Sequence, residues 1–232
     1  MIHQTVLFGQ DVKIGNYVKI EENVSIGDNV VIGEFVVIKE GTRIGNNVRI
    51  GDLSIIGKEP ASNHSMSRQP EKSSVGLCIE DDVIIGCNTV LFNGTILHKG
   101  AFVGDLASIR EKVVIGEASI IGRNAIVEMN TMIGKYVTIQ TGAYITADMI
   151  IEDNVFIGPC CSTSNDKYMG IGNYKHQGPI IRQGAKIGNN ATLLPGITIG
   201  KQAIVGAGSV VTKSVPDKHT VVGNPAISIN MK

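Results

Sequence analysis

The stretch that decides the fold is Val113-Val-Ile-Gly-Glu-Ala-Ser-Ile-Ile-Gly-Arg-Asn-Ala-Ile-Val-Glu-Met-Asn130, in which one pattern returns every six residues. An aliphatic residue recurs at Ile115, Ile121 and Val127, and Gly follows the first two of them. Glu128 stands where the third Gly is expected. The same period extends through most of the chain, so residues that break it are the first candidates for chemistry.

The period of six predicts a β-solenoid. Aliphatic residues fall six apart over 8–56 after an opening Phe, again over 79–163 apart from a closing Thr, and again over 181–211. An α-helix requires spacings near 3.6, and simple strand alternation gives no repeated Gly. Gly and Asn after the aliphatic residue tolerate the positive φ of tight bends. Each short strand should therefore bury one aliphatic side chain and stack on the next coil, as in a solenoid of hexapeptide type.

Two polar segments interrupt the period, at about 58–76 and about 164–179. We expect external loops there, because each coil of a solenoid contacts only its neighbours and tolerates insertions, which often build the binding face. The tail over about 216–232 is expected to cover the open end of the solenoid. The sequence thus predicts one domain over 1–232.

Composition narrows the class of function. Lys plus Arg and Asp plus Glu number 21 each, so no overall basic field indicates nucleic acid as a partner. No apolar run approaches the roughly 18 residues that a membrane span needs, and the N-terminus lacks the features of an export signal. The four Cys have no metal-ligand spacing and are predicted to be reduced. We therefore expect a cytoplasmic protein without a metal, a membrane or a nucleic-acid partner.

The last coils resemble the C-terminal signature of bacterial hexapeptide acyltransferases. The segments that carry this resemblance are ATLLPGITIGKQAIVGAGSVVTKSVP at 191–216 and VGNPA at 222–226. Three further segments resemble the branch that N-acylates nucleotide-linked amino sugars: GDLASIRE at 104–111, QTGAYIT at 140–146 and SNDKYM at 164–169. Members of that branch act on dTDP-3-amino-3,6-dideoxyhexoses, on UDP-linked 3-amino uronic acids, or in anthrose synthesis.

This resemblance implies an all-β fold, a left-handed parallel β-helix, although left-handed coils depart from the usual right-handed crossover. It implies a homotrimer with sites between neighbouring subunits and an acyl-CoA donor, acetyl-CoA in the simplest case, along the groove between them. The implied activity is that of an N-acyltransferase acting on the amine of a dTDP- or UDP-linked amino deoxy sugar. Attack of an amine on a thioester needs a neutral amine, a stabilised oxyanion and an orienting groove.

Residues about eighteen apart should stack on one corner, because one coil is about three hexads. Arg110, Glu128, Thr146 and Ser164 form such a column at the position usually held by Gly. We predict a polar groove along this corner, with Glu128 as general base or amine anchor; solvated corner residues are the plain alternative. The residues expected around the substrate are Arg110, Asn130, Thr146, Ser164, Asn165, Asp166 and Tyr168. Asp105 is a second carboxylate candidate.

His176 is the candidate base of the alternative function, a sugar O-acetyltransferase. Transferases of that kind commonly hold a His at the break after a segment like this one, where this chain reads Ser164-Asn-Asp166. This departure favours N-acylation over O-acylation. The resemblance implies that the donor's nucleotide end lies in the terminal coils, near Lys201, Lys213, Gly206 and Ala207. Gly allows close backbone approach there, and Lys can contact a phosphate.

Other solenoid functions fit the sequence less well. A γ-type carbonic anhydrase needs several His around zinc, and the five His here show no clustered pair. A non-catalytic ice-binding solenoid needs a flat face of Thr, which two long polar loops would spoil. A lipid A acyltransferase that uses acyl carrier protein usually adds a helical domain, for which the sequence shows no pattern.

Overall fold

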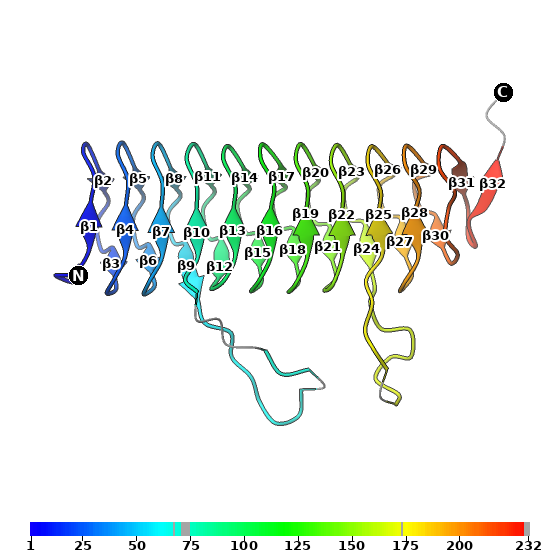
Figure 1. Cartoon of the computed structure of the whole chain (residues 1–232), viewed down its shortest axis with the longest axis horizontal. Helices are drawn as coiled ribbons and strands as arrows, with labels where there is room; N and C mark the ends of the chain where they lie inside the picture. Colours follow the sequence, from blue (N-terminus) through cyan, green and yellow to red (C-terminus); the bar gives the residue numbers. More distant parts are fainter. Residues whose placement is uncertain (67, 71–74, 173, 230–232) are drawn as a thin grey trace.

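The computed structural model describes residues 1–66, 68–70, 75–172 and 174–229, which form short strands joined by turns and two loops. The strands wind into an elongated solenoid, in which successive strands enter three different sheets in turn (Figure 1). Neighbouring strands pair in parallel, and within the described ranges the last strand alone joins antiparallel. The predicted fold, a left-handed parallel β-helix of hexapeptide repeats, is confirmed.

Sheet I contains the first strand of each coil. Its strands are β1 (Leu7–Phe8), β4 (Ser25–Ile26), β7 (Arg43–Ile44), β10 (Cys78–Ile79), β13 (Ile96–Leu97), β16 (Val114–Ile115), β19 (Met132–Ile133), β22 (Ile150–Ile151), β25 (Ile180–Ile181) and β28 (Thr198–Ile199).

Sheet II contains the second strand of each coil and also the tail. Its strands are β2 (Lys13–Ile14), β5 (Val31–Ile32), β8 (Arg49–Ile50), β11 (Ile84–Ile85), β14 (Phe102–Val103), β17 (Ile120–Ile121), β20 (Thr138–Ile139), β23 (Phe156–Ile157), β26 (Lys186–Ile187), β29 (Ile204–Val205), β31 (Thr220–Val222) and β32 (Ile227–Ile229).

Sheet III contains the third strand of each coil. Its strands are β3 (Lys19–Ile20), β6 (Val37–Ile38), β9 (Ile55–Lys58), β12 (Val90–Phe92), β15 (Ser108–Ile109), β18 (Ile126–Val127), β21 (Tyr144–Ile145), β24 (Ser162–Thr163), β27 (Thr192–Leu193) and β30 (Val210–Val211). We call the turn after sheet I the I–II corner, the turn after sheet II the II–III corner, and the turn after sheet III the III–I corner.

The core is one column of aliphatic side chains that fills the solenoid. In each strand the second residue points inward: Ile121 is fully buried, whereas Ile120 beside it is 41% exposed. Burial of such a side chain contributes about 1.5–3 kcal/mol, so the six-residue period is the energetic basis of the fold. Hydroxyls inside the column are satisfied by the backbone, since Ser119 donates to the Gly134 carbonyl at 2.7 Å.

The strand register confirms that residues eighteen apart stack. Ser108 pairs with Ile126, Ile126 with Tyr144, and Tyr144 with Ser162. Neighbouring strands lie about 4.8 Å apart, so each step of eighteen residues advances the chain by that distance along the axis.

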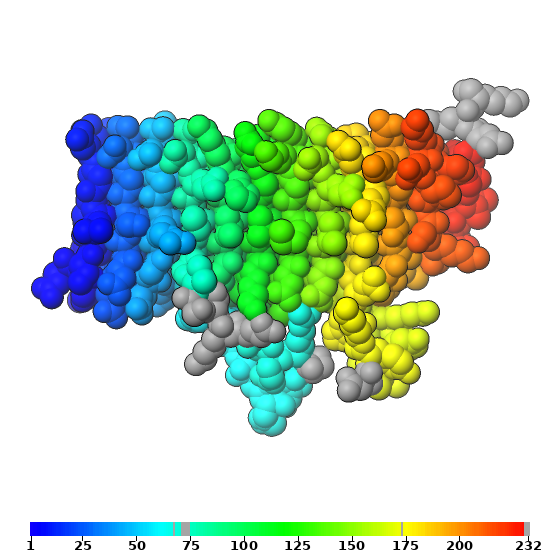
Figure 2. Space-filling view, viewed as in Figure 1, coloured from blue at the N-terminus to red at the C-terminus, as the bar shows by residue number. Residues whose placement is uncertain are grey.

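Both external loops leave the III–I corner. The first joins β9 to β10 and the second joins β24 to β25. They hang from the same side of the solenoid in Figure 1, and Figure 2 shows them as two protrusions below the body. The loops lie where the sequence predicts them, at about 58–76 and 164–179, although positions 67, 71–74 and 173 within them lie outside the described residues.

The tail lies along the last coils. β31 pairs with β29, and β32 runs antiparallel to β31. Val210 of β30 donates its N–H to the Gly223 carbonyl at 2.9 Å and accepts one from Ala226 at 2.8 Å. The tail thus pairs with the end of the solenoid, while residues 230–232 of the expected cap lie outside the described part of the chain.

Candidate active site

The first cluster on the III–I corner consists of one arginine and two glutamates. Arg110 donates to Glu111 through Nε at 2.7 Å and Nη2 at 3.0 Å, and its Nη1 lies 3.5 Å from Glu128. Glu111 is 1% exposed, so its charge depends on this arginine. One guanidinium thus serves two carboxylates, and the cluster carries a surplus negative charge at Glu128.

Glu128 is a half-buried carboxylate with a raised pKa. Desolvation by burial is the main cause of the rise; Arg110 acts to lower the pKa, and Glu111 to raise it. The pKa of Tyr144 on the next coil is also raised, first by burial and then by the charge of Glu128. A carboxylate whose pKa lies above its ordinary value is closer to the pH at which it can accept a proton efficiently.

Phe92 of β12 lies beneath the cluster and links it to the first loop. The Arg110 guanidinium lies 5.0 Å from the centre of the Phe92 ring, and Lys58 Nζ lies 5.2 Å from the same centre. Asn93 donates a hydrogen bond to the Glu59 carboxylate. The start of the first loop is therefore fixed beside Arg110 by cation–π contacts and a hydrogen bond.

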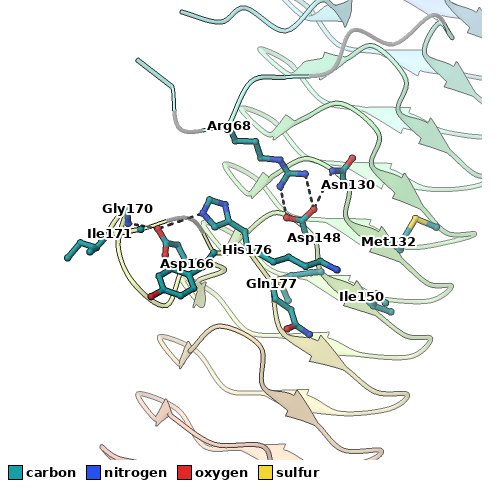
Figure 3. Close-up of a pocket in the computed structure, with 14 residues that line it drawn as sticks. Arg68, Asn130, Met132, Asp148, Ile150, Asp166, Gly170, Ile171, His176 and Gln177 are labelled. Atoms are coloured by element: carbon teal, nitrogen blue, oxygen red, sulfur yellow. Dashed lines mark hydrogen bonds and ion pairs between the residues drawn. The ribbon is translucent and has the colours of Figure 1, made fainter. Parts of the chain in front are cut away.

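A cavity of about 650 Å³ lies further along the same corner and is lined by residues of both loops (Figure 3). Asn130, two residues after Glu128, lines it, together with Asp148, Asp166 and His176. Met132 and Ile150, the outward residues of neighbouring strands in sheet I, supply an apolar wall. The volume is that of a small-molecule site, and the many charged and polar side chains on the other walls suit a polar, charged ligand.

Asp148 is held by side chains from two other segments. Arg68 of the first loop donates to it through Nη1 at 2.5 Å and Nη2 at 3.1 Å. Asn130 Nδ2 donates to Asp148 Oδ1 at 3.3 Å. Asp148 has φ 61°, a left-handed conformation that Asp tolerates, and this conformation places it at the tip of the corner.

Asp166 and His176 face each other across the second loop. The Asp166 carboxylate accepts N–H groups from Tyr168 at 2.8 Å and Gly170 at 2.6 Å, and these bonds lower its pKa. His176 Nε2 lies 3.9 Å from Asp166 Oδ2. Tyr168 stacks on Tyr174 with ring centres 3.9 Å apart. The loop therefore presents an imidazole beside a carboxylate that its own backbone fixes.

The structure brings most of the predicted substrate residues to one corner. Arg110 and Glu128 are in contact, while Asn130, Asp166 and His176 line the cavity. Ser164 and Asn165 are half-buried at the start of the second loop, where the Asn165 carbonyl accepts the Gln177 N–H at 2.9 Å.

Two predicted residues have structural surroundings that differ from the expectation. Asp105 lies on the II–III corner, where its Oδ1 accepts the Cys87 N–H at 2.8 Å, as Asp28 does for Gln10. Its carboxylate therefore connects coils and is separated from the site. Thr146 is 3% exposed, and its backbone N–H donates to Thr163 Oγ1 at 2.8 Å, so it lies beneath the groove.

The four residues expected to hold the donor do not come together. Lys201 lies on the I–II corner, Gly206 and Ala207 on the II–III corner, and Lys213 on the III–I corner. A Cβ at Gly206 would lie 2.7 Å from Val222 Cγ1, so packing of the tail explains this Gly. Lys213 alone of the four shares the corner that carries both loops.

Sequence reasoning missed Arg68, Glu111 and Asp148. Asp148 lies eighteen residues after Asn130 and eighteen before Asp166, so the same spacing that selects the first column could have found it. Glu111 follows Arg110 directly, but its burial has no sequence signal. Arg68 stands in a loop without periodicity, and its position has no signal in the sequence either.

Family comparisons agree with this architecture. The bacterial transferase hexapeptide (six repeats) matches residues 5–40 and 178–213, and the hexapeptide repeat of succinyl-transferase matches residues 112–147. The matched segments are similar to the repeats of hexapeptide-repeat bacterial transferases. The predicted resemblance is confirmed by these matches and by the curated relatives described next.

Two curated proteins and one solved structure illustrate the similarity. The bifunctional protein GlmU of Thermotoga maritima is 33% identical over 163 residues, which are 70% of this chain and 30% of that protein. The dTDP-3-amino-3,6-dideoxy-alpha-D-galactopyranose 3-N-acetyltransferase of Aneurinibacillus thermoaerophilus is 51% identical over 47 residues, 20% of this chain and 24% of that enzyme. The crystal structure of PerB from Caulobacter crescentus in complex with CoA and GDP-perosamine has a TM-score of 0.48 and 25% identity, over 56% of this chain and 57% of that one. The chain spans about 30% of the length of the first curated relatives.

Two searches of the described residues gave negative results. In the ranges 1–66, 68–70, 75–172 and 174–229 no helix has the length and apolarity to cross a membrane. Within the same part of the chain, no group of three or more His, Cys, Asp or Glu is arranged to hold a metal ion.

Proposed function

We propose that the chain transfers an acyl group, acetyl in the simplest case, from a CoA thioester to the amine of a dTDP- or UDP-linked amino deoxy sugar. The observation that carries this proposal is the III–I corner, which holds both a half-buried carboxylate of raised pKa, Glu128, and a cavity lined by two further carboxylates, Asp148 and Asp166. The similarity to an enzyme named as a 3-N-acetyltransferase of a dTDP-linked amino sugar supports the acceptor class.

The carboxylates of the corner suit an amine. A sugar ammonium that enters the cavity can pair with Asp148 or Asp166, and Glu128 shares Arg110 with Glu111 on the same corner. Glu128 is the proposed proton acceptor, because burial makes its carboxylate more basic than an exposed one. Loss of one proton leaves the neutral amine that can attack.

The transfer itself balances without a metal or a redox partner. The amine nitrogen forms a bond to the thioester carbonyl carbon, and the carbon–sulfur bond then breaks. The nitrogen loses one proton in forming the amide, and the departing thiolate takes up one proton to become the CoA thiol. Asn130 and Gln177, which line the cavity, are the side-chain amides available to bind the carbonyl oxygen as charge develops on it.

The donor is proposed to lie along the III–I corner beyond the second loop. Pro195 and Gly196 continue that corner one coil after the loop, and Lys213 follows on the next coil. Lys213 is exposed and can contact a phosphate of the nucleotide end as a point charge. Lys201 stands on a different corner and is assigned no donor role.

A trimer is the proposed functional unit. Tyr144 at 38% and Met132 at 48% exposure flank the corner on sheets III and I, so a neighbouring copy placed there would close the groove. Closure would exclude water and strengthen the electrostatic interactions of Glu128. Sites between subunits are what the family resemblance implies.

One observation favours the second candidate function, a sugar O-acyltransferase. His176 lies on the cavity wall with its Nε2 3.9 Å from Asp166, and a carboxylate can orient an imidazole that takes a proton from a hydroxyl. Since a hydroxyl needs a base more than an amine does, this pair matters most for an oxygen acceptor.

Release of CoA thiol tests both candidates. We expect release with acetyl-CoA when an amino-sugar nucleotide is present, and background release with the corresponding neutral sugar nucleotides. A panel of dTDP- and UDP-linked amino sugars that gives only background would refute the N-acyltransferase. Release with the hydroxyl-bearing sugars alone would select the O-acyltransferase instead.

A further inference from the structure

The ion pair between Arg68 and Asp148 joins distant parts of the molecule. Arg68 belongs to the loop after β9, whereas Asp148 follows β21, four strands further along sheet III. At about 4.8 Å per strand, the loop carries the guanidinium about 19 Å along the solenoid axis. In Figure 3 the Arg68 side chain descends on the Asp148 carboxylate, with Asn130 beside it.

Asp148 differs from Glu111 and Asp166 in what holds it. Glu111 is buried against its neighbour Arg110, and Asp166 is fixed by N–H groups of its own loop. Asp148 is bonded by the side chains of Arg68 and Asn130, which come from other segments. Side chains can change partners by rotation, whereas the backbone bonds of Asp166 require the loop to refold.

The pair is also accessible to a ligand. The side chains of Arg68 and Asp148 are 34% and 25% exposed, and both residues line the cavity. Ion pairs with this much solvent contact are weak, because water competes with each charge.

The end of the second loop packs against the residue before Asp148. A Cβ at Gly178 would lie 2.7 Å from the Ala147 carbonyl oxygen. Asp148 therefore lies between the two loops and is open toward the cavity.

We propose that Arg68 and Asp148 are a charge-exchange site for a zwitterionic acceptor. The inference rests on the proposed function for the acceptor class, a nucleotide-linked amino sugar, which carries an ammonium at one end and a diphosphate at the other. Asp148 exchanges the guanidinium for the ammonium while Asn130 stays bonded to it. Arg68 then turns to the diphosphate, whose oxygens its planar fork binds in a bidentate manner. Each charge of the opened pair gains a new partner of opposite sign.

The exchange also distinguishes substrate from product. Acylation converts the ammonium group into a neutral amide, so the product has no charge for Asp148 to bind. Arg68 then returns to Asp148, and the diphosphate loses its guanidinium. The N-acylated product is therefore expected to bind as weakly as a nucleotide sugar that never had an amine.

Calorimetric binding of three probes tests the inference without turnover. The probes are a dTDP-linked 3-amino-3,6-dideoxyhexose, dTDP-glucose and dTDP, with the UDP-linked counterparts as a second series. The intact protein should bind the amino sugar at least tenfold more tightly than dTDP-glucose. Asp148→Asn should abolish that preference, and Asn tolerates the φ of 61° at this position. Arg68→Ala should weaken binding of the amino sugar about tenfold and leave dTDP-glucose and dTDP nearly unchanged, because without an ammonium Arg68 stays on Asp148.

A matched ion pair provides the control. Arg182 and Glu152, 2.6 Å apart, lie on the I–II corner away from the cavity, so Arg182→Ala should change neither the preference nor dTDP binding. Thermal unfolding of each variant shows that it is folded. The inference is overturned if the amine preference survives Asp148→Asn, or if Arg68→Ala weakens dTDP-glucose as much as the amino sugar, while the intact protein still turns over amino sugars. If no probe in either series binds and no thiol is released, the proposed function fails and this inference fails with it.

Discussion

The guanidinium of Arg110 forms a bidentate hydrogen bond with the buried carboxylate of Glu111, its neighbour in the chain. This pair has a consequence for stability that can be measured apart from activity. Arg110→Met should lower the free energy of unfolding by about 3 kcal/mol, because it leaves a buried carboxylate without its counter-charge. Urea denaturation gives the value.

The matched control is Arg182→Met, which removes the arginine of a more exposed pair and should cost less than about 1 kcal/mol. Adding Glu111→Leu to Arg110→Met should recover most of the loss, since the unpaired charge is then gone. Equal losses for the two arginine variants would show that Glu111 does not depend on Arg110.

Glu128→Gln tests the proposed proton acceptor. The substitution keeps the shape of the side chain and removes its basicity, so kcat for an amino-sugar acceptor should fall about 100-fold or more. The acid side of the kcat–pH profile should lie above the ordinary carboxyl pKa of 4.5 in the intact protein and vanish in the variant. Glu117→Gln, which removes an exposed carboxylate paired with Lys135, should leave kcat unchanged.

The same substitution has a predictable effect on stability. Burial raises the pKa of Glu128 in the folded protein, so the folded state binds this proton more tightly than the unfolded chain. The contribution of the protonated Glu128 side chain to stability is fully present below pH 4.5, and it is lost as pH rises through the raised pKa. Glu128→Gln should therefore gain stability relative to the intact protein as pH rises toward 7. Thermal unfolding of both proteins at pH 4 and pH 7 measures this difference. A variant that loses stability relative to the intact protein between pH 4 and pH 7 contradicts the expected direction.

His176→Asn separates the two acceptor classes. For an amine acceptor we expect kcat to fall less than tenfold, because Glu128 takes the proton and the histidine only lines the cavity. For a hydroxyl acceptor the loss should exceed 100-fold, since the imidazole beside Asp166 is then the base. Thiol release with each acceptor distinguishes these outcomes. A larger loss for the amine than for the hydroxyl would remove the assignment of Glu128.

The fold was predictable because one local rule repeats. An aliphatic residue every six positions, followed by Gly or Asn, specifies both the buried column and the bends, and it also gives the eighteen-residue stacking. That stacking placed Arg110 and Glu128 on one corner, where they lie 3.5 Å apart. The same rule could have separated Asp105 from the site candidates. Asp105 follows a Gly, as Asp28 and Asp52 do, and all three accept an N–H from the preceding coil.

The remaining parts of the site depend on contacts without a period. Arg68 reaches Asp148 across 80 residues of chain, and the loop that carries it has no repeat from which its direction could be inferred. His176 and Asp166 meet because the second loop folds back on itself. Local chemistry in a solenoid is predictable along its columns and unpredictable in its insertions.

The II–III corner offers a test of backbone strain. Leu106 has φ 61° and is 54% exposed, whereas Asn124 holds the equivalent position of the next coil with φ 55°. A left-handed conformation costs an ordinary L-residue about 1–2 kcal/mol, and Asn is among the residues that relieve this cost. Leu106→Asn should therefore raise the free energy of unfolding by about 1 kcal/mol, and Asn124→Leu should lower it by a similar amount. Urea denaturation measures both, and a loss of stability in Leu106→Asn would mean that the exposed leucine makes contacts that outweigh its backbone strain.

Substitutions of Lys213 and Lys201 test whether the donor lies along the III–I corner or the I–II corner. Both lysines are exposed in the terminal coils, but Lys213 lies on the III–I corner and Lys201 on the I–II corner. Lys213→Met should raise KM for acetyl-CoA about tenfold with little change in kcat, because it removes a phosphate contact made equally in the ground and transition states. Lys201→Met should leave KM unchanged. The effect of Lys213→Met should shrink as salt increases, since an exposed charge contact is screened. If Lys201→Met raises KM while Lys213→Met does not, the donor follows the other corner, and the groove past Gly196 has a different role.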